Sequence, residues 1–251
     1  MPGNLNSAIS KASSEFIANL HDGDIYRSDL IEKWFIALSK YPEALFVFNE
    51  YSFIDENGKT KNIIRHEFKE VNEGVKLADY FFLNLSSGPW GTVMVRKYAY
   101  DTYGMFNPEF GFISDVEMWL RFAFYGKFCY ISEPLISLTS RESNHPYYLP
   151  HNLVTFNTCK ILSIYFNKFL LVDPVLQNKK KLIRYKLKKY IFWECLILLK
   201  YLKIKKCLKH LILLIPFYNK KMFLLFNKIN NNDNQLSLFN NWIDIIKLNY
   251  K

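Results

Sequence analysis

The chain has 251 residues, half of them hydrophobic and 18% aromatic, with a formal net charge of +10. This length and composition allow a substantial core and exclude an intrinsically disordered protein. Residues 151–251 hold 19 Lys and Arg against 4 Asp and Glu, whereas residues 1–150 hold 14 against 19. The sequence therefore predicts two parts with different roles, a mildly acidic one over residues 1–150 and a strongly basic one over residues 151–251.

Residues 1–150 have the pattern of a mixed α/β domain. Apolar runs predict strands at residues 16–20, 44–51 and 92–95, and strand segments at 128–131 and 135–138. Apolar residues at helical spacing predict one helix that is N-capped by Ser28 and ends before Pro42. A second helix is predicted from Asp115 to Tyr125, preceded by Ser114, which forms the S-x-x-E capping box with Glu117.

The basic part predicts amphipathic helices. Between residues 179 and 209, lysines alternate with aliphatic and aromatic residues. The longest apolar runs, residues 190–199 and 211–218, fall short of the ~20 residues that a membrane-spanning helix needs. Three roles remain open for these helices: binding to an anionic membrane surface, a bundle with a solvated basic face, and nucleic-acid binding. Nucleic acid is the least favoured, because no groove-reading motif accompanies the charge.

The cysteines give an expectation about the compartment. Cys129, Cys159, Cys195 and Cys207 lie far apart, and none belongs to a CxxC pair. This spacing argues against a structural zinc site and a disulfide framework, and it is typical of a reducing compartment. The first sixteen residues also lack the apolar core of a signal peptide. We therefore expect a cytoplasmic protein, located peripherally on the inner face of the membrane if the basic helices bind lipid.

Two acidic segments could carry chemistry. Asp22-Gly23-Asp24 follows the first predicted strand, and two carboxylates at the carboxyl end of a buried strand could bind a divalent cation. Gly23 would let a phosphate approach the backbone closely. Asp115 begins a predicted helix and could be a general base in a pocket. Taken alone, both segments have simpler explanations, an acidic turn and a carboxylate that favours a helix N-terminus.

The order of these motifs resembles that of family-2 glycosyltransferases of the GT-A fold. Those enzymes carry a D-x-D motif after a strand, followed by motifs of the type "v-M-x-R-R", "E-D-x-D-L-W-L-R" and "I-x-E-P-L". The matching segments here are, in order, Asn6–Ala8, Leu20–Tyr26, Pro42–Ala44, Asp55–Gly58, Val93–Arg96, Gly104–Phe106, Ser114–Arg121 and Glu133–Leu135. The resemblance covers residues 4 to 140, and it implies a partial GT-A (Rossmann-like) mixed sheet with flanking helices, followed by the basic helical region.

The resemblance also implies roles for individual residues. Asp22, Gly23 and Asp24 would bind the diphosphate of a nucleotide-sugar donor, with Mn²⁺ (or Mg²⁺) held by Asp22 and Asp24. Asp115 would be the base of an inverting transfer. The acceptor-facing segment contains Trp90 and Gly91; a buried turn aromatic is an equal alternative for Trp90. His145 could approach the metal, although a surface histidine is the favoured interpretation. For Trp119, core packing is favoured.

The expected function is that of a metal-dependent, hexosyltransferase-like enzyme of polysaccharide biosynthesis, acting on a saccharide or lipid-linked acceptor. Two departures limit the resemblance. The family's Glu-Asp pair is Ser114-Asp115 here, and the first strand and nucleobase-binding aspartate that family members place before the Asn6 segment are missing. The chain is therefore expected to be the carboxyl-terminal part of such an enzyme, with a complementing chain as a further partner. The alternative is an inactive remnant that binds a partner or a membrane.

Overall fold

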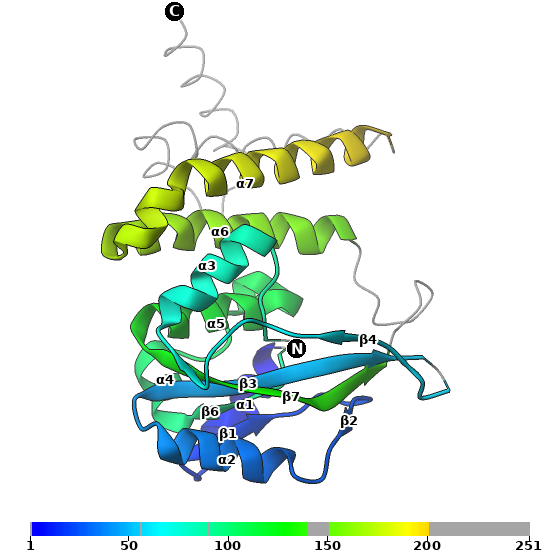
Figure 1. The fold of residues 1–251 in the computed structure, drawn as a ribbon, viewed down its shortest axis with the longest axis vertical. Coiled ribbons are helices and arrows are strands. Elements are labelled where there is room, and N and C mark those ends of the chain that lie inside the picture. Colours follow the sequence, from blue (N-terminus) through cyan, green and yellow to red (C-terminus); the bar gives the residue numbers. More distant parts are fainter. Residues whose placement is uncertain (1, 56, 90, 140–150, 201–251) are drawn as a thin grey trace, which may run out of the picture. The chain divides into compact units, whose positions relative to one another are not determined.

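The computed structural model describes residues 2–55, 57–89, 91–139 and 151–200 (Figure 1). Contacts divide the chain into one compact unit that ends at Ile183 and a second that begins at Arg184. The sheet and the helices that cover it belong to the first unit. Within the described ranges, no helix combines the length and the hydrophobicity that crossing a membrane requires.

The first unit is mixed α/β, as the sequence predicted. Its strands are β1 (Phe16–Asn19), β2 (Ile25–Tyr26), β3 (Ala44–Ile54), β4 (Thr60–Ile64), β5 (Val71–Asn72), β6 (Val93–Arg96) and β7 (Lys127–Thr139). The helices of the described chain are α1 (Pro2–Lys11), α2 (Leu30–Lys40), α3 (Gly74–Asn84), α4 (Lys97–Tyr103), α5 (Ser114–Tyr125), α6 (His151–Val172) and α7 (Pro174–Lys200). A 3-10 helix, Pro108–Ile113, leads directly into α5.

The described strands form one mixed sheet in the order β1-β6-β3-β7-β2, with β4 beside β3 and β5 beside β7. Strand β6 runs antiparallel to both β1 and β3, and β3 runs parallel to β7. Strands β1, β3 and β7 therefore point in the same direction. In the β1–β6 pair Asn19 lies opposite Val93, so the segment that follows β1 and the segment that precedes β6 leave the sheet at the same end.

Helices cover both faces of the sheet (Figure 1). On one face, Trp34 and Leu38 of α2 are buried in a cluster with Val47 of β3. On the other face, the Trp119 ring of α5 packs against Phe46 of β3, with ring centroids 5.5 Å apart. Because neighbouring residues of a strand point to opposite faces, the apolar run of β3 supplies both layers of the core.

Several predicted boundaries are confirmed, and three details are wrong. The strands predicted at 16–20, 44–51 and 92–95 are β1, β3 and β6, with ends shifted by one to three residues. The N-cap of α2 is Asp29, not Ser28. Ser114 lies inside α5, whose N-cap is Ile113, so no capping box forms. The two segments predicted at 128–131 and 135–138 are one strand, β7.

A bulge explains why β7 continues through a proline. Asn49 of β3 pairs with Ile131, and the next residue, Glu50, pairs with Pro134. The extra residues of β7 are accommodated at this shift in register, and the strand then resumes its pairing with β3. Proline is tolerated in a strand at such irregular positions.

Candidate active site

The turn between β1 and β2 carries the two predicted metal ligands. Gly23 has a φ of +84°, which lies in the left-handed region that favours glycine. Its carbonyl accepts a hydrogen bond from Thr139 Oγ1 at 3.2 Å. Asp22 is exposed and Asp24 is partly buried. The turn therefore presents two carboxylates, one of them partly buried, at the carboxyl end of β1.

Tyr26 fixes the backbone of this turn. Its hydroxyl donates to the His21 carbonyl at 2.6 Å and accepts from the His21 N–H at 2.7 Å. Burial raises the pKa of Tyr26; the hydrogen bond with His21 opposes that effect, and the negative charges of Asp24 and Asp22 add to it. Both carboxylates therefore lie close enough to the phenol to act on it electrostatically.

Gly91 brings three segments of the chain together. It precedes β6 and has a φ of +78°. A Cβ atom built on Gly91 would lie 2.6 Å from His21 Cε1 and 2.9 Å from Asp115 Oδ2. The imidazole that follows β1 and the carboxylate at the start of α5 therefore both lie against the Gly91 backbone, where a larger residue would displace them.

Asp115 lies in the first turn of α5 and is partly buried. Removal from water raises the pKa of its carboxyl to about 6, although backbone N–H groups of Val116 and Asp115 act in the opposite direction by hydrogen bonding to the ionised form. A carboxylate whose pKa lies close to neutral pH is a more effective general base than an ordinary aspartate. Asp115 is therefore a stronger base near neutral pH than an ordinary aspartate.

His21 lies between the acidic turn and Asp115. Its Nδ1 atom is 3.9 Å from Asp24 Oδ2. The Cε1 and Nε2 atoms of the same ring lie within 3.0 Å of the position that a Gly91 Cβ would occupy, which is also where Asp115 approaches. His21 is not among the site residues predicted from the sequence. Its place beside Asp22 was a weak indication, because its approach to Gly91 depends on the β1–β6 register.

The donor atoms suit a divalent cation that also binds a ligand. Carboxylates are preferred by Mg²⁺ and Mn²⁺, and an imidazole is acceptable to Mn²⁺. Within the described part of the chain, no three His, Cys, Asp or Glu side chains are grouped so that they could hold a metal by themselves. Mg²⁺-type ions are commonly held by one or two carboxylates, with water and substrate phosphates as the other ligands. The acidic turn fits this second type of site.

The other residues singled out from the sequence are placed only in part. Trp90 and His145 lie outside the described residues. Trp119 is 1% exposed and packs in the core, as favoured from the sequence. Its neighbour Arg121 forms an ion pair with Glu117 at 2.9 Å and donates to main-chain carbonyls at the end of α4, so its role is structural.

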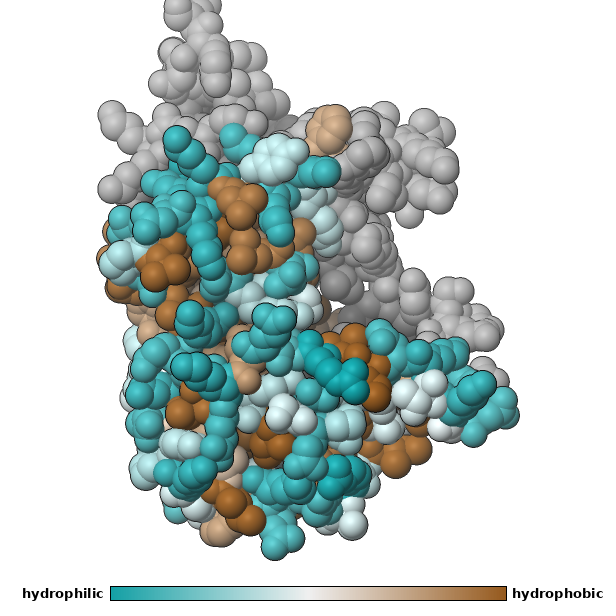
Figure 2. All heavy atoms as spheres, viewed as in Figure 1, coloured by the Kyte–Doolittle hydropathy of each residue, from teal (hydrophilic) through white to brown (hydrophobic). Residues whose placement is uncertain are grey.

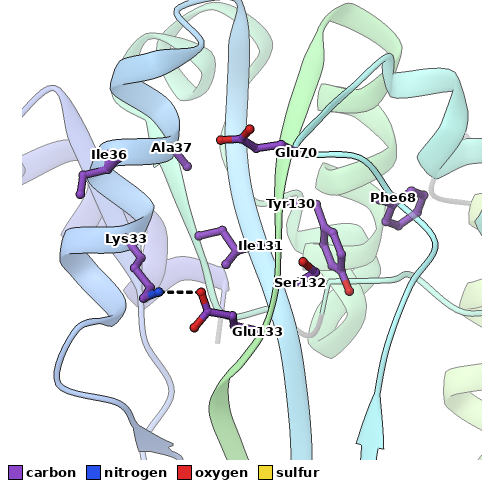
Figure 3. Close-up of a pocket in the computed structure, with 9 residues that line it drawn as sticks. All are labelled: Lys33, Ile36, Ala37, Phe68, Glu70, Tyr130, Ile131, Ser132 and Glu133. Carbon is purple, nitrogen blue, oxygen red and sulfur yellow. Dashed lines mark hydrogen bonds and ion pairs between the residues drawn. The ribbon is translucent and has the colours of Figure 1, made fainter.

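An open cavity of about 470 Å³ lies beside α2 and β7 (Figure 3). Figure 3 shows Lys33 of α2 directed toward Glu133 of β7, and the two side chains form an ion pair at 2.6 Å. Glu70, which also lines the cavity, pairs with Lys40. None of the acidic-turn residues, Gly91 or Asp115 lines this cavity. The charged side chains that line the cavity, Lys33, Glu70 and Glu133, are all in ion pairs. The cavity is therefore a weaker candidate for catalysis than the acidic turn.

No protein-family model matches the chain, and no curated protein matches it.

Proposed function

We propose that the chain is a glycosyltransferase, or part of one, that transfers a sugar from a nucleotide-diphosphate sugar to a saccharide or lipid-linked acceptor. The observation that supports this proposal is that His21 and Asp115 both lie against Gly91, while the same His21 ring is 3.9 Å from Asp24 of the acidic turn. A pair of carboxylates at the end of a strand and a carboxylate of raised pKa on a facing helix are what a metal-dependent displacement needs.

The proposed fold is a partial GT-A domain. Its support is the mixed sheet, with β1, β3 and β7 parallel and the acidic turn at the carboxyl end of β1. Ligands of α/β proteins bind beyond the carboxyl ends of parallel strands, and the acidic turn occupies such a position. The order of motifs that resembles family-2 glycosyltransferases points in the same direction.

Asp22 and Asp24 would hold Mn²⁺ or Mg²⁺ against the donor diphosphate, with Gly23 allowing the phosphates to approach. When bound, such an ion neutralises the charge that develops on the departing diphosphate. Asp115 would accept the proton of the acceptor hydroxyl as its oxygen bonds to the anomeric carbon. The bond from that carbon to the diphosphate breaks, and the nucleoside diphosphate leaves with the electron pair. A single displacement of this kind inverts the anomeric centre.

One observation favours a second candidate, a non-catalytic binding protein. Among the described strands, β1 pairs with β6 alone, so one edge of the strand that bears the acidic turn is not paired within the sheet. Such edges are normally covered or joined by another strand. In this alternative the three aspartates are leftovers of an ancestral site, and a complementing chain or a membrane is the partner.

Nucleotide binding separates the two candidates. We would titrate the full chain with UDP, GDP and CDP, each with and without Mn²⁺, and repeat the series with Asp24→Asn. Asp101→Asn is the matched control, because Asp101 is an exposed residue of α4 that pairs with Lys97. The transferase proposal expects Mn²⁺-dependent binding that Asp24→Asn abolishes and Asp101→Asn retains. Folded protein that binds none of the nucleotides would favour the binding-protein alternative.

A further inference from the structure

Helix α7 has apolar residues on two opposite faces. Leu176, Ile183, Leu187 and Ile191 are buried and recur at helical spacing. The opposite side of the same helix carries Val175, Leu182, Tyr185 and Phe192, each between 49% and 63% exposed. These four residues are spaced seven, three and seven positions apart, which places them on one stripe of the helix. We call them the outer stripe.

The apolar surface continues at the start of α7. Leu171 and Val172, the last residues of α6, are 78% and 61% exposed. Asp173 follows them and accepts a hydrogen bond from the Leu176 N–H at 3.0 Å, which fixes the first turn of α7. Figure 2 shows hydrophobic surface where α6 meets α7, set among hydrophilic side chains. Several large apolar side chains therefore lie exposed next to one another at this end of the helix.

Basic residues accompany the outer stripe. Seven lysines and arginines occur between Asn178 and Tyr190, and Glu194 is the only acidic residue between Asp173 and Asp233. Lys181 and Lys189 are exposed and, by helical spacing, lie on the same side as the outer stripe. The exposed apolar side chains are therefore bordered by positive charge.

We propose that the outer stripe of α7 binds the surface of an anionic phospholipid bilayer, with the helix lying in the plane of the membrane. Leucine, valine, tyrosine and phenylalanine side chains would enter the boundary between headgroups and acyl chains. The lysines beside them would extend their ammonium groups to the lipid phosphates.

The residue types in and beside the outer stripe favour a lipid bilayer over nucleic acid or an acidic protein as its partner. A nucleic-acid surface is matched by positive charge and stacking rings, and gives no reason for exposed Val175, Leu182, Leu171 and Val172. An acidic protein would account for the charge, but a bilayer accounts for both the charge and the aliphatic side chains. Membrane binding by α7 and the adjoining end of α6 is independent of the transferase activity.

Binding of the full chain to lipid vesicles tests the proposal. We would compare vesicles of phosphatidylcholine with vesicles that also contain phosphatidylglycerol, at low and high salt, by flotation. We expect binding to the anionic vesicles that weakens as salt is added. Lys181→Gln with Lys189→Gln should weaken it by about 30-fold, from the usual contribution of a lysine near an anionic surface. Lys59→Gln with Lys61→Gln, two exposed lysines of the β3–β4 hairpin, is the matched control and should change binding little.

A second variant tests the contribution of the exposed apolar side chains of the outer stripe. Leu182→Ser with Tyr185→Ser removes two exposed side chains and should also weaken vesicle binding, while circular dichroism remains that of the parent chain. Failure of the folded parent chain to bind anionic vesicles would overturn the proposal. So would an equal loss in the control pair, or unchanged binding by the serine variant. Binding to duplex DNA that depends on Lys181 and Lys189, without any vesicle binding, would assign the surface to nucleic acid instead.

Discussion

A carboxyl group with a raised pKa costs the folded protein stability, and Asp115 imposes that cost at the start of α5. In the unfolded chain its pKa is the ordinary 3.8, and in the folded protein it is about 6. The folded state therefore holds the proton more tightly, and stability falls as the pH rises from about 4 to about 6. Asp115→Asn should be more stable than the parent chain by about 3 kcal/mol near pH 7.5, and nearly equal to it near pH 4.

Urea unfolding of both chains at the two pH values measures this difference. Asp101→Asn, the same exchange at an exposed position of α4, should show no comparable gain. Equal stabilities of the parent chain and Asp115→Asn at both pH values would contradict a raised pKa for this partly buried carboxyl group. A gain in stability accompanied by a loss of transfer activity is typical of a residue retained for function.

The absence of a side chain at Gly91 leaves room for His21 and Asp115 in the candidate site. Gly91→Ala should destabilise the protein, because a left-handed non-glycine residue costs ~1–2 kcal/mol and because its Cβ would press on His21 and Asp115. Gly58→Ala is the control: Gly58 has nearly the same φ, +77°, but no atom lies within 4 Å of its added Cβ. Both variants should lose stability in urea unfolding, and Gly91→Ala should lose more. Mn²⁺-nucleotide binding should disappear in Gly91→Ala alone; retention there would separate Gly91 from the site.

His66 makes the fold sensitive to acid. It is buried against the rings of Phe48, Tyr80 and Tyr130, and within the described residues neither ring nitrogen has a hydrogen-bond partner. Burial lowers its pKa from 6.5 to about 4. The folded state therefore favours the neutral ring, and stability is lost as the pH falls from about 6.5 to about 4. His66→Phe should be more stable than the parent chain by about 2 kcal/mol near pH 5, and the advantage should shrink above pH 7. A thermal-unfolding series across this range measures it; a difference independent of pH would contradict the assignment.

At the scale of the elements, the sequence predicted those whose apolar pattern is strong. The runs that became β1, β3 and β6 and the periodic segments that became α2 and α5 were found because burial on one or both faces leaves a regular pattern. Helices α1, α3 and α4 were missed, since α1 and α4 are short and none of the three has a clear capping motif. The capping box of α5 failed because Glu117 pairs with Arg121 one turn later in the same helix and accepts a hydrogen bond from Tyr165 of α6, a tertiary contact that the sequence pattern does not reveal.

The sequence predicted some residues of the candidate site but not how they are arranged. Asp22, Asp24 and Asp115 were selected by residue type and position. The contact of His21 and Asp115 at Gly91 depends on strand register and on the placement of α5, which the sequence pattern does not determine.

A buried ionic network joins three helices. Arg121 of α5 pairs with Glu117 and donates to the carbonyl of Gly104 after α4, and Tyr165 of α6 donates to Glu117. Arg121→Met should cost about 3–5 kcal/mol, because it leaves a buried carboxylate without its cation. The double variant with Glu117→Met should lose less than the sum of the two single losses in urea unfolding. Additive losses would show that the two side chains act independently.

At the scale of the whole molecule, the division by charge and the division by packing differ. Net charge changes sign near residue 150, whereas contacts divide the chain between Ile183 and Arg184. Helix α6 explains the difference, because its apolar residues complete the core of the first unit. The Phe166 ring packs against Phe82 of α3 with centroids 5.4 Å apart, and Phe169 packs against Phe124 of α5 at 5.3 Å. Charge patterning reports the surface of a region, and it does not locate a folding boundary.

Truncation tests which division matters for folding. A chain that ends at residue 150 lacks α6, so Phe82 loses Phe166, Phe124 loses Phe169 and Glu117 loses Tyr165. Uncovering the buried Phe82 and the partly buried Phe124 and removing one polar contact should cost ~5 kcal/mol, comparable to the whole stability of a small domain. We therefore expect residues 1–150 to lack a cooperative transition in urea, with tryptophan fluorescence as the probe. A chain that ends at residue 200 keeps the entire first unit and is the control; it should unfold cooperatively. A sharp transition with the same midpoint in both chains would show that residues 1–150 fold on their own, as the charge pattern alone suggested.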